Sequence, residues 1–178
     1  TRPDLEIVLY QREDFVAYSA CGLPYLIAGD VASHEALIAR TPAQFAQQGI
    51  DVRVGHEVVA VDGAAGKVTV RDRDGNRTFD DHYDHLVIAT GAQPLVPPVE
   101  GVDLPGVFQL RSLADGLAVN AYMADERPGS AVVVGGGYIG VEMAEAFVAR
   151  GLKVTLLDMA PQVLRTLDVE IARLVEAH

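Results

Sequence analysis

Short apolar runs, separated by turns rich in glycine, predict an α/β fold for this chain. Runs rich in β-branched side chains predict buried strands at residues 5–10, 86–90 and 131–134. Valines separated by glycine turns predict a small antiparallel hairpin layer between these strands, and they are Val52, Val54, Val58, Val59, Val61, Val68 and Val70. After residue 111 the pattern predicts helix, strand, glycine loop, helix, strand, and a last helix over residues 168–178.

The composition narrows the classes of protein to consider. Hydrophobic residues make up 49% of the 178 residues, which is enough to form a packed core. The net charge of -11 argues against a nucleic-acid partner. No apolar run approaches the roughly 18 residues of a membrane helix, and the first residues lack the pattern of a secretory signal. A single cysteine excludes an internal disulfide. We therefore expect a cytoplasmic protein that binds no membrane.

A glycine-rich turn lies between the predicted strand at residues 131–134 and a predicted helix at residues 141–150. Gly135 suits a tight turn, Gly137 allows the backbone to approach a pyrophosphate, and Gly140 allows the helix to pack closely on the strand. The next predicted strand, residues 153–157, ends at Asp158, 23 residues after Gly135 (158 − 135). This spacing suits an acid that binds the ribose 2′-hydroxyl and repels a 2′-phosphate, so NAD(H) is favoured over NADP(H). The alternative is a glycine loop that only tightens the turn.

Cys21 allows two interpretations. A lone cysteine among apolar residues is more often a packed small hydrophobe than a nucleophile. Gly22, however, leaves space beside the sulfur, and the turn residues around it would expose the sulfur to a planar ligand. A helix that starts here would also favour the thiolate through its dipole.

Three segments together resemble a known family. Residues 16–25, 83–94 and 135–140 are similar to the single-cysteine branch of the FAD-dependent pyridine nucleotide-disulfide oxidoreductases. That branch includes coenzyme A-disulfide reductase, persulfide reductase, NADH oxidase and NADH peroxidase. The resemblance implies part of a Rossmann-like FAD domain with the hairpin layer at residues 1–109, followed by the start of a Rossmann NAD(H) domain at residues 110–178. The first glycine loop of such an FAD domain does not occur, so we expect an interior fragment that binds FAD poorly and is inactive by itself.

The resemblance also implies roles for individual residues. Hydride would pass from NADH to FAD, and the electrons would then reach Cys21 as the catalytic residue. The implied cofactor-binding residues are Gln11, Arg12, Val58, Ala89, Thr90, Gly91, Gly135, Gly137, Tyr138, Ile139, Gly140, Glu142 and Asp158. No metal site is implied. For Ala89, Thr90 and Gly91, a simple turn at the end of a strand is an alternative. For Val58, Tyr138 and Glu142, ordinary packing or solvation is an alternative.

The chain departs from the family pattern at several positions. Gln11 stands where the family usually has a glutamate that holds the FAD ribose, and an amide lacks the charge assistance of a carboxylate. Ala17 and Ala20 stand where coenzyme A-disulfide reductases commonly have Ser and Asn. Lys67 and Lys153 are the only lysines. These departures weaken the inference that the substrate carries coenzyme A.

The leading hypothesis is an NADH-dependent flavoprotein that reduces a disulfide or persulfide, and coenzyme A-type compounds are the expected substrates. The first alternative is an NADH oxidase or peroxidase that forms a sulfenate on Cys21. The second is a nucleotide-binding redox sensor without turnover. Family analogy further implies a homodimer.

Overall fold

The computed structural model describes residues 5–177, and the chain forms two compact units. Unit 1 comprises Thr1–Ser19 and Ile38–Gln93, and unit 2 comprises Ala20–Leu37 and Pro94–His178. The chain therefore passes between the units three times along its sequence. The boundary between an FAD domain and an NAD(H) domain, expected between residues 109 and 110, stays a prediction about the whole protein. The predicted end of the last helix, at His178, lies outside the described residues.

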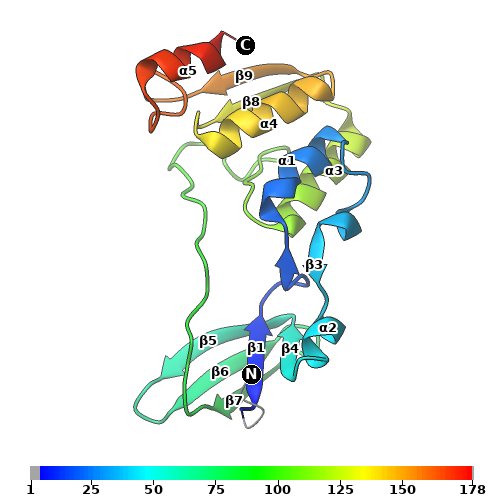
Figure 1. Ribbon diagram of the computed structural model, residues 1–178, viewed down its shortest axis with the longest axis vertical. Helices are drawn as coiled ribbons and strands as arrows, with labels where there is room; N and C mark the ends of the chain where they lie inside the picture. The colour runs from blue at the N-terminus through cyan, green and yellow to red at the C-terminus, as the bar shows by residue number, and fades with distance from the viewer. Residues whose placement is uncertain (1–4, 178) are drawn as a thin grey trace. The chain divides into compact units, whose positions relative to one another are not determined.

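Unit 1 contains a parallel strand pair, a short antiparallel pair and a small helix (Figure 1). β1 (Ile7–Gln11) pairs in parallel with β4 (Ile50–Val54), which confirms the strand predicted near the start of the chain. β2 (Ala17–Tyr18) pairs antiparallel with β3 (Ile38–Arg40). α2 (Pro42–Ala46) begins after Thr41, whose side chain forms a capping box with Gln44.

The predicted hairpin layer is confirmed as a three-stranded antiparallel sheet. β5 (His56–Asp62), β6 (Lys67–Asp72) and β7 (Arg77–His82) pair in this order, and Val68 and Val70 of the central strand are buried. The assignment of Val52 and Val54 to this layer was wrong, because both belong to β4. Gly55, at φ 68°, changes the direction of the chain between β4 and β5. The sequence shows a glycine at this turn but does not show that the strands on its two sides belong to different sheets.

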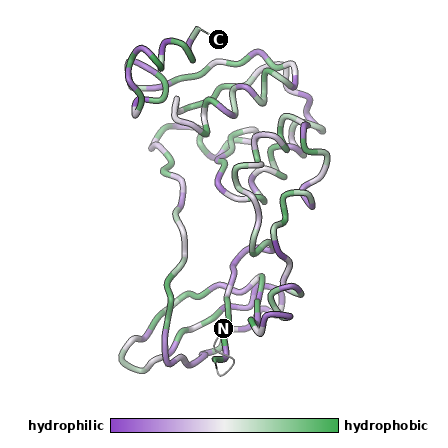
Figure 2. The backbone as a smooth tube through the Cα atoms, viewed as in Figure 1, coloured by the Kyte–Doolittle hydropathy of each residue, from purple (hydrophilic) through white to green (hydrophobic). Residues whose placement is uncertain are grey.

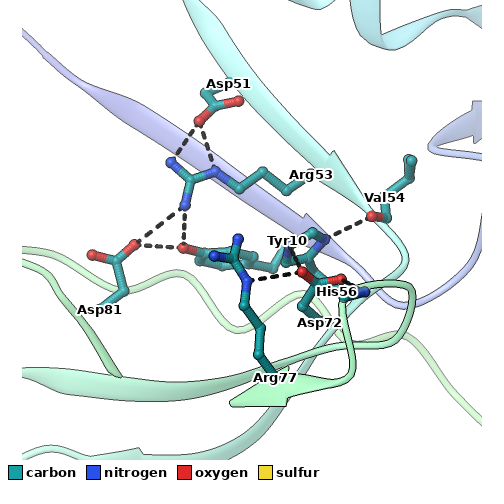
Figure 3. A network of polar contacts seen from close by, with 9 residues as sticks. Tyr10, Asp51, Arg53, Val54, His56, Asp72, Arg77 and Asp81 are labelled. Atoms are coloured by element: carbon teal, nitrogen blue, oxygen red, sulfur yellow. Dashed lines mark hydrogen bonds and ion pairs between the residues drawn. The ribbon is translucent and has the colours of Figure 1, made fainter. Parts of the chain in front are cut away.

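A network of polar side chains connects the strands of unit 1 (Figure 3). The Tyr10 hydroxyl on β1 donates to Asp81 of β7 at 2.5 Å and accepts from Arg53 of β4 at 2.9 Å. Burial, followed by the hydrogen bond to Asp81, raises the pKa of Tyr10 to about 12. Arg53 in turn pairs with Asp51 at 2.7 Å. The network thus ties the parallel pair to the edge of the antiparallel sheet.

The strand predicted at residues 86–90 is absent from the structure. Residues 86–99 form no helix or strand, and Val87 and Ile88 are 84% and 72% exposed although the segment is apolar (Figure 2). A β-strand needs a neighbouring strand for its backbone hydrogen bonds, and none of the described strands pairs with residues 86–90. A run of apolar residues indicates that a segment tends to be buried. Whether the segment forms a strand depends on a partner strand that can lie far away in the sequence.

Unit 2 contains two helices packed on a strand–helix–strand segment. η1 (Ala20–Gly22), α1 (Leu23–Ala28) and η2 (His34–Leu37) come from the first segment of this unit. The second segment contributes α3 (Leu113–Glu126), β8 (Ser130–Val134), α4 (Tyr138–Ala149), β9 (Lys153–Leu157) and α5 (Val169–Glu176). β8 and β9 are parallel. These elements confirm the predicted order after residue 111.

The core of unit 2 joins α1, α3 and α4. Its buried side chains are Ile27, Val119, Met123, Met143 and Ala146. Ile27 of α1 is fully buried, so this short helix is held by packing rather than by its own length. Among residues 5–177, no helix is both long and apolar enough to cross a membrane.

Candidate nucleotide-binding site and exposed cysteine

The glycine turn between β8 and α4 adopts the geometry that the sequence predicts. Gly135 has φ 111°, a conformation that L side chains rarely adopt, and its N–H donates to the Leu157 carbonyl at 2.7 Å. A Cβ at position 140 would overlap the Gly135 carbonyl oxygen, so Gly140 is needed for α4 to pack this closely on the turn. The tight turn and the close helix contact are both present.

The backbone at the N-terminus of α4 is open to solvent. Gly137 is the N-cap of this helix, and no side chain caps the free N–H groups of the first turn. A Cβ built on Gly137 meets no atom within 4 Å, so the backbone is open to an approaching ligand. Uncapped N–H groups and the positive end of the helix dipole favour an anion at this place.

Asp158 follows β9 and reaches the glycine turn. Its Oδ2 accepts the Gly136 N–H at 2.5 Å, and its Oδ1 accepts the Ala160 N–H at 2.6 Å. The Ala160 and Gly136 N–H groups hold the pKa of Asp158 below its usual value, and the charge of Arg165 lowers it further. The structure therefore brings an ionised carboxylate to the turn, in the place where a ribose is expected.

Tyr138, Ile139 and Glu142 lie on the first turns of α4. Tyr138 and Ile139 are 57% and 56% exposed, and Glu142 is also exposed. Tyr138 and Glu142 are four residues apart and so share one face of the helix. Neither exposed apolar side chain contributes to the core, which leaves both free to contact a ligand.

Cys21 lies in η1, directly before α1, and its side chain is exposed. A Cβ at Gly22 would overlap Cδ2 of Leu37, a buried side chain. The absence of a side chain at position 22 therefore lets Leu37 pack beneath the turn, a reason that the sequence did not reveal. The exposed sulfur meets the accessibility that a thiol reacting with an external partner requires.

Two side chains that the sequence analysis missed connect the helix after Cys21 to the rest of unit 2. Arg150, at the end of α4, donates to the Ile27 carbonyl at 2.9 Å. Asn120 of α3 donates to the Leu26 carbonyl at 3.3 Å. Both satisfy carbonyls in the last turn of α1. Since they come from distant positions, no local sequence pattern signals them.

The residues expected to contact FAD lie in unit 1, and they occupy different kinds of position there. Gln11 ends β1, and its amide donates to the Phe15 carbonyl at 3.0 Å. The Arg12 guanidinium lies 3.8 Å from the Glu13 carboxylate, while its carbonyl accepts from Arg73. Val58 lies on β5 and is 38% exposed.

Ala89, Thr90 and Gly91 are exposed and belong to no strand. We expected these three residues at the end of a strand, and the described residues form no strand there. Within residues 5–177, no group of three His, Cys, Asp or Glu side chains is arranged to hold a metal ion.

The strand, glycine turn, helix and terminal acid have the arrangement typical of the α/β folds that bind dinucleotides. The family model described as "Pyridine nucleotide-disulphide oxidoreductase" matches residues 1–178. The chain belongs to this family.

Relatives with different activities share this similarity. An NADH oxidase of Methanocaldococcus jannaschii is 42% identical over 98% of this chain and 39% of its own length. A coenzyme A-dependent NAD(P)H sulfur oxidoreductase of Pyrococcus abyssi is 40% identical with the same two coverages. A crystal structure of an engineered NADPH oxidase derived from the Lactobacillus brevis enzyme has a TM-score of 0.93 and 30% identity, covering 99% of this chain and 39% of that one. This chain thus spans about two fifths of the length of these relatives.

Proposed function

We propose that the whole protein is an NADH-dependent flavoprotein that reduces a disulfide or persulfide through Cys21. One observation carries the proposal: a single compact unit holds both an open glycine turn with its acid and an exposed cysteine. The helix after the cysteine packs on the helix after the turn. A dinucleotide site and a reactive sulfur on one rigid frame suit a reductase.

The residues divide the work as follows. The α4 N-terminus at Gly135 and Gly137 would hold the pyrophosphate, and Asp158 would accept a hydrogen bond from the ribose 2′-hydroxyl. Tyr138, Ile139 and Glu142 would lie beside the nicotinamide half. The residues proposed to contact FAD are Gln11, Arg12, Val58, Ala89, Thr90 and Gly91. When bound, FAD would supply the chemistry that converts a hydride from NADH into an electron pair for sulfur.

Cys21 would exchange with the substrate as a thiolate. Its sulfur attacks one sulfur of a disulfide, forms a mixed disulfide and releases the first thiolate. An electron pair, which derives from NADH, then breaks the mixed disulfide, releases the second thiolate and restores Cys21. Overall, one NADH and one proton convert one disulfide into two thiols.

The test uses the whole protein with FAD bound, under anaerobic conditions. NADH is added first and the flavin absorbance is followed; coenzyme A disulfide, a persulfide, peroxide or oxygen is added next. We expect NADH to bleach the flavin in both the unsubstituted protein and Cys21→Ser, because the sulfur is not needed for hydride transfer. Only the unsubstituted protein should then turn over with the disulfide or persulfide. If Cys21→Ser retains every NADH-consuming activity, the thiol mechanism is wrong.

An oxidase or peroxidase is the second candidate, and the name of the Methanocaldococcus relative favours it. Here the Cys21 thiolate would take one oxygen from peroxide, forming a sulfenate and releasing water after protonation. A further electron pair and protons would return the thiolate and a second water. Turnover with peroxide or oxygen but not with sulfur substrates would identify this activity. Nucleotide binding without turnover would instead identify a redox sensor.

We also propose a cytoplasmic homodimer. The single cysteine is compatible with a reducing compartment. The homodimer rests on family analogy, and sedimentation of the whole protein would test it.

The same site bears on the choice between NADH and NADPH. The engineered Lactobacillus brevis enzyme replaces a glycine by alanine, an aspartate eighteen residues later by alanine, and a proline seven residues further on by arginine. In this chain Gly140 and Asp158 have the first spacing (158 − 140 = 18), and Arg165 follows at the second (165 − 158 = 7). Asp158 supports a preference for NADH. The arginine that replaces the proline in the engineered enzyme has a counterpart here in Arg165, as judged from the spacing.

A further inference from the structure

The last turn of α1 leaves two of its carbonyls without the partners that a continuing helix would supply. In such a helix, the N–H groups four residues later would donate to the Leu26 and Ile27 carbonyls. Here those N–H groups, of Asp30 and Val31, donate instead to the Tyr25 carbonyl, at 3.0 Å and 3.2 Å, because the chain turns away at the left-handed C-cap of the helix. Since Leu26 and Ile27 are buried, their carbonyls need donors from elsewhere in the fold.

Two side chains from distant elements supply these donors. Asn120 of α3 donates to the Leu26 carbonyl. Arg150, directly after α4, donates to the Ile27 carbonyl. The Arg150 bond is the stronger of the two, because it is shorter, at 2.9 Å against 3.3 Å, and its donor carries a charge that suits the carbonyl end of a helix. The Oδ1 atom of Asn120 is buried without a hydrogen-bond partner among the described residues, so this side chain acts through its donor alone. We call these two side chains the carbonyl clasp.

The carbonyl clasp bears on Cys21 because α1 is short and directly follows η1, which contains the cysteine. A helix of six residues is not stable by itself, and the apolar packing of Leu23, Leu26 and Ile27 has no directional preference. Hydrogen bonds are directional, so the two bonds of the clasp fix the tilt of the helix. Such a helix is about 9 Å long, so a tilt of about 10° about its clasped end would move the other end by about 1.5 Å. A displacement of about 1 Å can slow a reaction about 100-fold.

We propose that Arg150 is a positioning residue for Cys21, with Asn120 as the second and weaker half of the carbonyl clasp. The proposal rests on the proposed function, in which Cys21 is the reacting thiol. Arg150 contacts no substrate in this proposal. It holds the helix that starts beside the cysteine against the helix that starts at the glycine turn, so that the thiol keeps one place relative to the nucleotide site.

Hydrogen exchange of the whole protein tests whether the carbonyl clasp holds α1. Arg150→Met keeps the apolar stem but removes the donors, and we expect the backbone N–H groups of residues 23–29 to exchange at least about tenfold faster. Asn120→Leu, which has nearly the same volume, should accelerate the same N–H groups about fivefold, because the bond that it removes is longer and uncharged. Exchange in β9 of the same unit should stay unchanged, which distinguishes local loosening from a loss of global stability.

Kinetics of the whole protein with FAD bound test whether this hold serves the thiol. For Arg150→Met we expect kcat with the disulfide or persulfide to fall at least about tenfold. The KM for NADH and the rate at which NADH bleaches the flavin should stay within about twofold, because the substitution leaves the glycine turn intact. Arg150→Lys, which retains a charged donor, should restore most of kcat. A side chain that only fills space would show neither this split nor this rescue.

Arg127→Met is the matched control. Arg127 is the C-cap of α3 as Arg150 is that of α4, and no hydrogen bond or ion pair joins it to the described residues of α1. This substitution should change neither exchange in α1 nor kcat. Thermal melting checks that each variant folds; if Arg150→Met does not, Arg150→Gln, whose side chain is shorter and uncharged, takes its place.

The outcomes separate the two hypotheses. If either exchange in α1 or kcat stays within about twofold of the unsubstituted protein in the Arg150 variant that lacks the charge, the inference is wrong while the proposed function stands. If the unsubstituted protein does not reduce a disulfide or persulfide through Cys21, the proposed function is wrong and the inference falls with it.

Discussion

Gly137→Ala separates the role of the glycine turn in folding from its role in binding. Gly137 has φ −77° and ψ −175°, a conformation that any L residue adopts, and a new Cβ would meet nothing within 4 Å. Replacing an N-cap glycine by alanine costs about 0.5–1 kcal/mol. The reduced freedom of the unfolded chain offsets about 0.4–1 kcal/mol of this cost. The net change in the free energy of unfolding should therefore stay below about 1 kcal/mol.

Binding should respond much more strongly. The added methyl group projects into the space where the backbone would approach the pyrophosphate, and it would push the anion away from the free N–H groups. A hydrogen bond to a charged group contributes about 1.5–3 kcal/mol. The loss of one such bond weakens binding at least tenfold.

Titration calorimetry with ADP-ribose and thermal unfolding of the same samples measure the two effects. The melting temperature should move by less than about 4 °C. Gly129→Ala is the control, since its Cβ also meets nothing within 4 Å and it lies before β8, at the opposite end of the strand from the turn. It should change neither quantity. An affinity of Gly137→Ala within twofold of the unsubstituted protein would refute the assignment of the turn as a pyrophosphate site.

Two further predictions concern stability. Gly22→Ala should lower the free energy of unfolding by about 1 kcal/mol, because the new Cβ displaces buried Leu37; chemical denaturation measures this, and an unchanged midpoint would contradict the packing argument. The pKa of the Tyr10 phenol is raised from 10.0 to about 12, so the folded protein keeps this proton at pH values where the unfolded chain has lost it. The contribution of Tyr10 to the free energy of unfolding is therefore complete below pH 10 and is lost as the pH rises to about 12. Denaturation across this pH range should show a smaller loss in Tyr10→Phe, and an equal loss in both proteins would contradict the assignment.

The elements that the sequence predicted well are those whose signals are local. β8, the glycine turn, α4 and β9 follow one another within thirty residues, and strand pattern, turn chemistry and helix pattern agree there. The steric roles of Gly135 and Gly140 could be predicted because the geometry of such a turn depends on close neighbours in the chain.

The elements that the sequence predicted poorly depend on distant contacts. The apolar residues 86–90 have the composition of a strand, but pairing requires a second strand that the described residues do not provide. Val52 and Val54 were placed in the wrong sheet because the periodicity of a strand does not specify its partner.

The division of the chain has a consequence for anyone who wishes to transplant or truncate this nucleotide-binding module. Unit 2 is discontinuous, since residues 20–37 supply α1 and the segment that begins at Pro94 supplies α3 and α4, which pack on it. A polypeptide cut to begin at Pro94 would leave Val119, Met123, Met143 and Ala146 without their contact to Ile27 and would expose this apolar surface to aggregation. A functional graft must therefore carry both pieces, joined by a new linker or supplied as two complementing fragments.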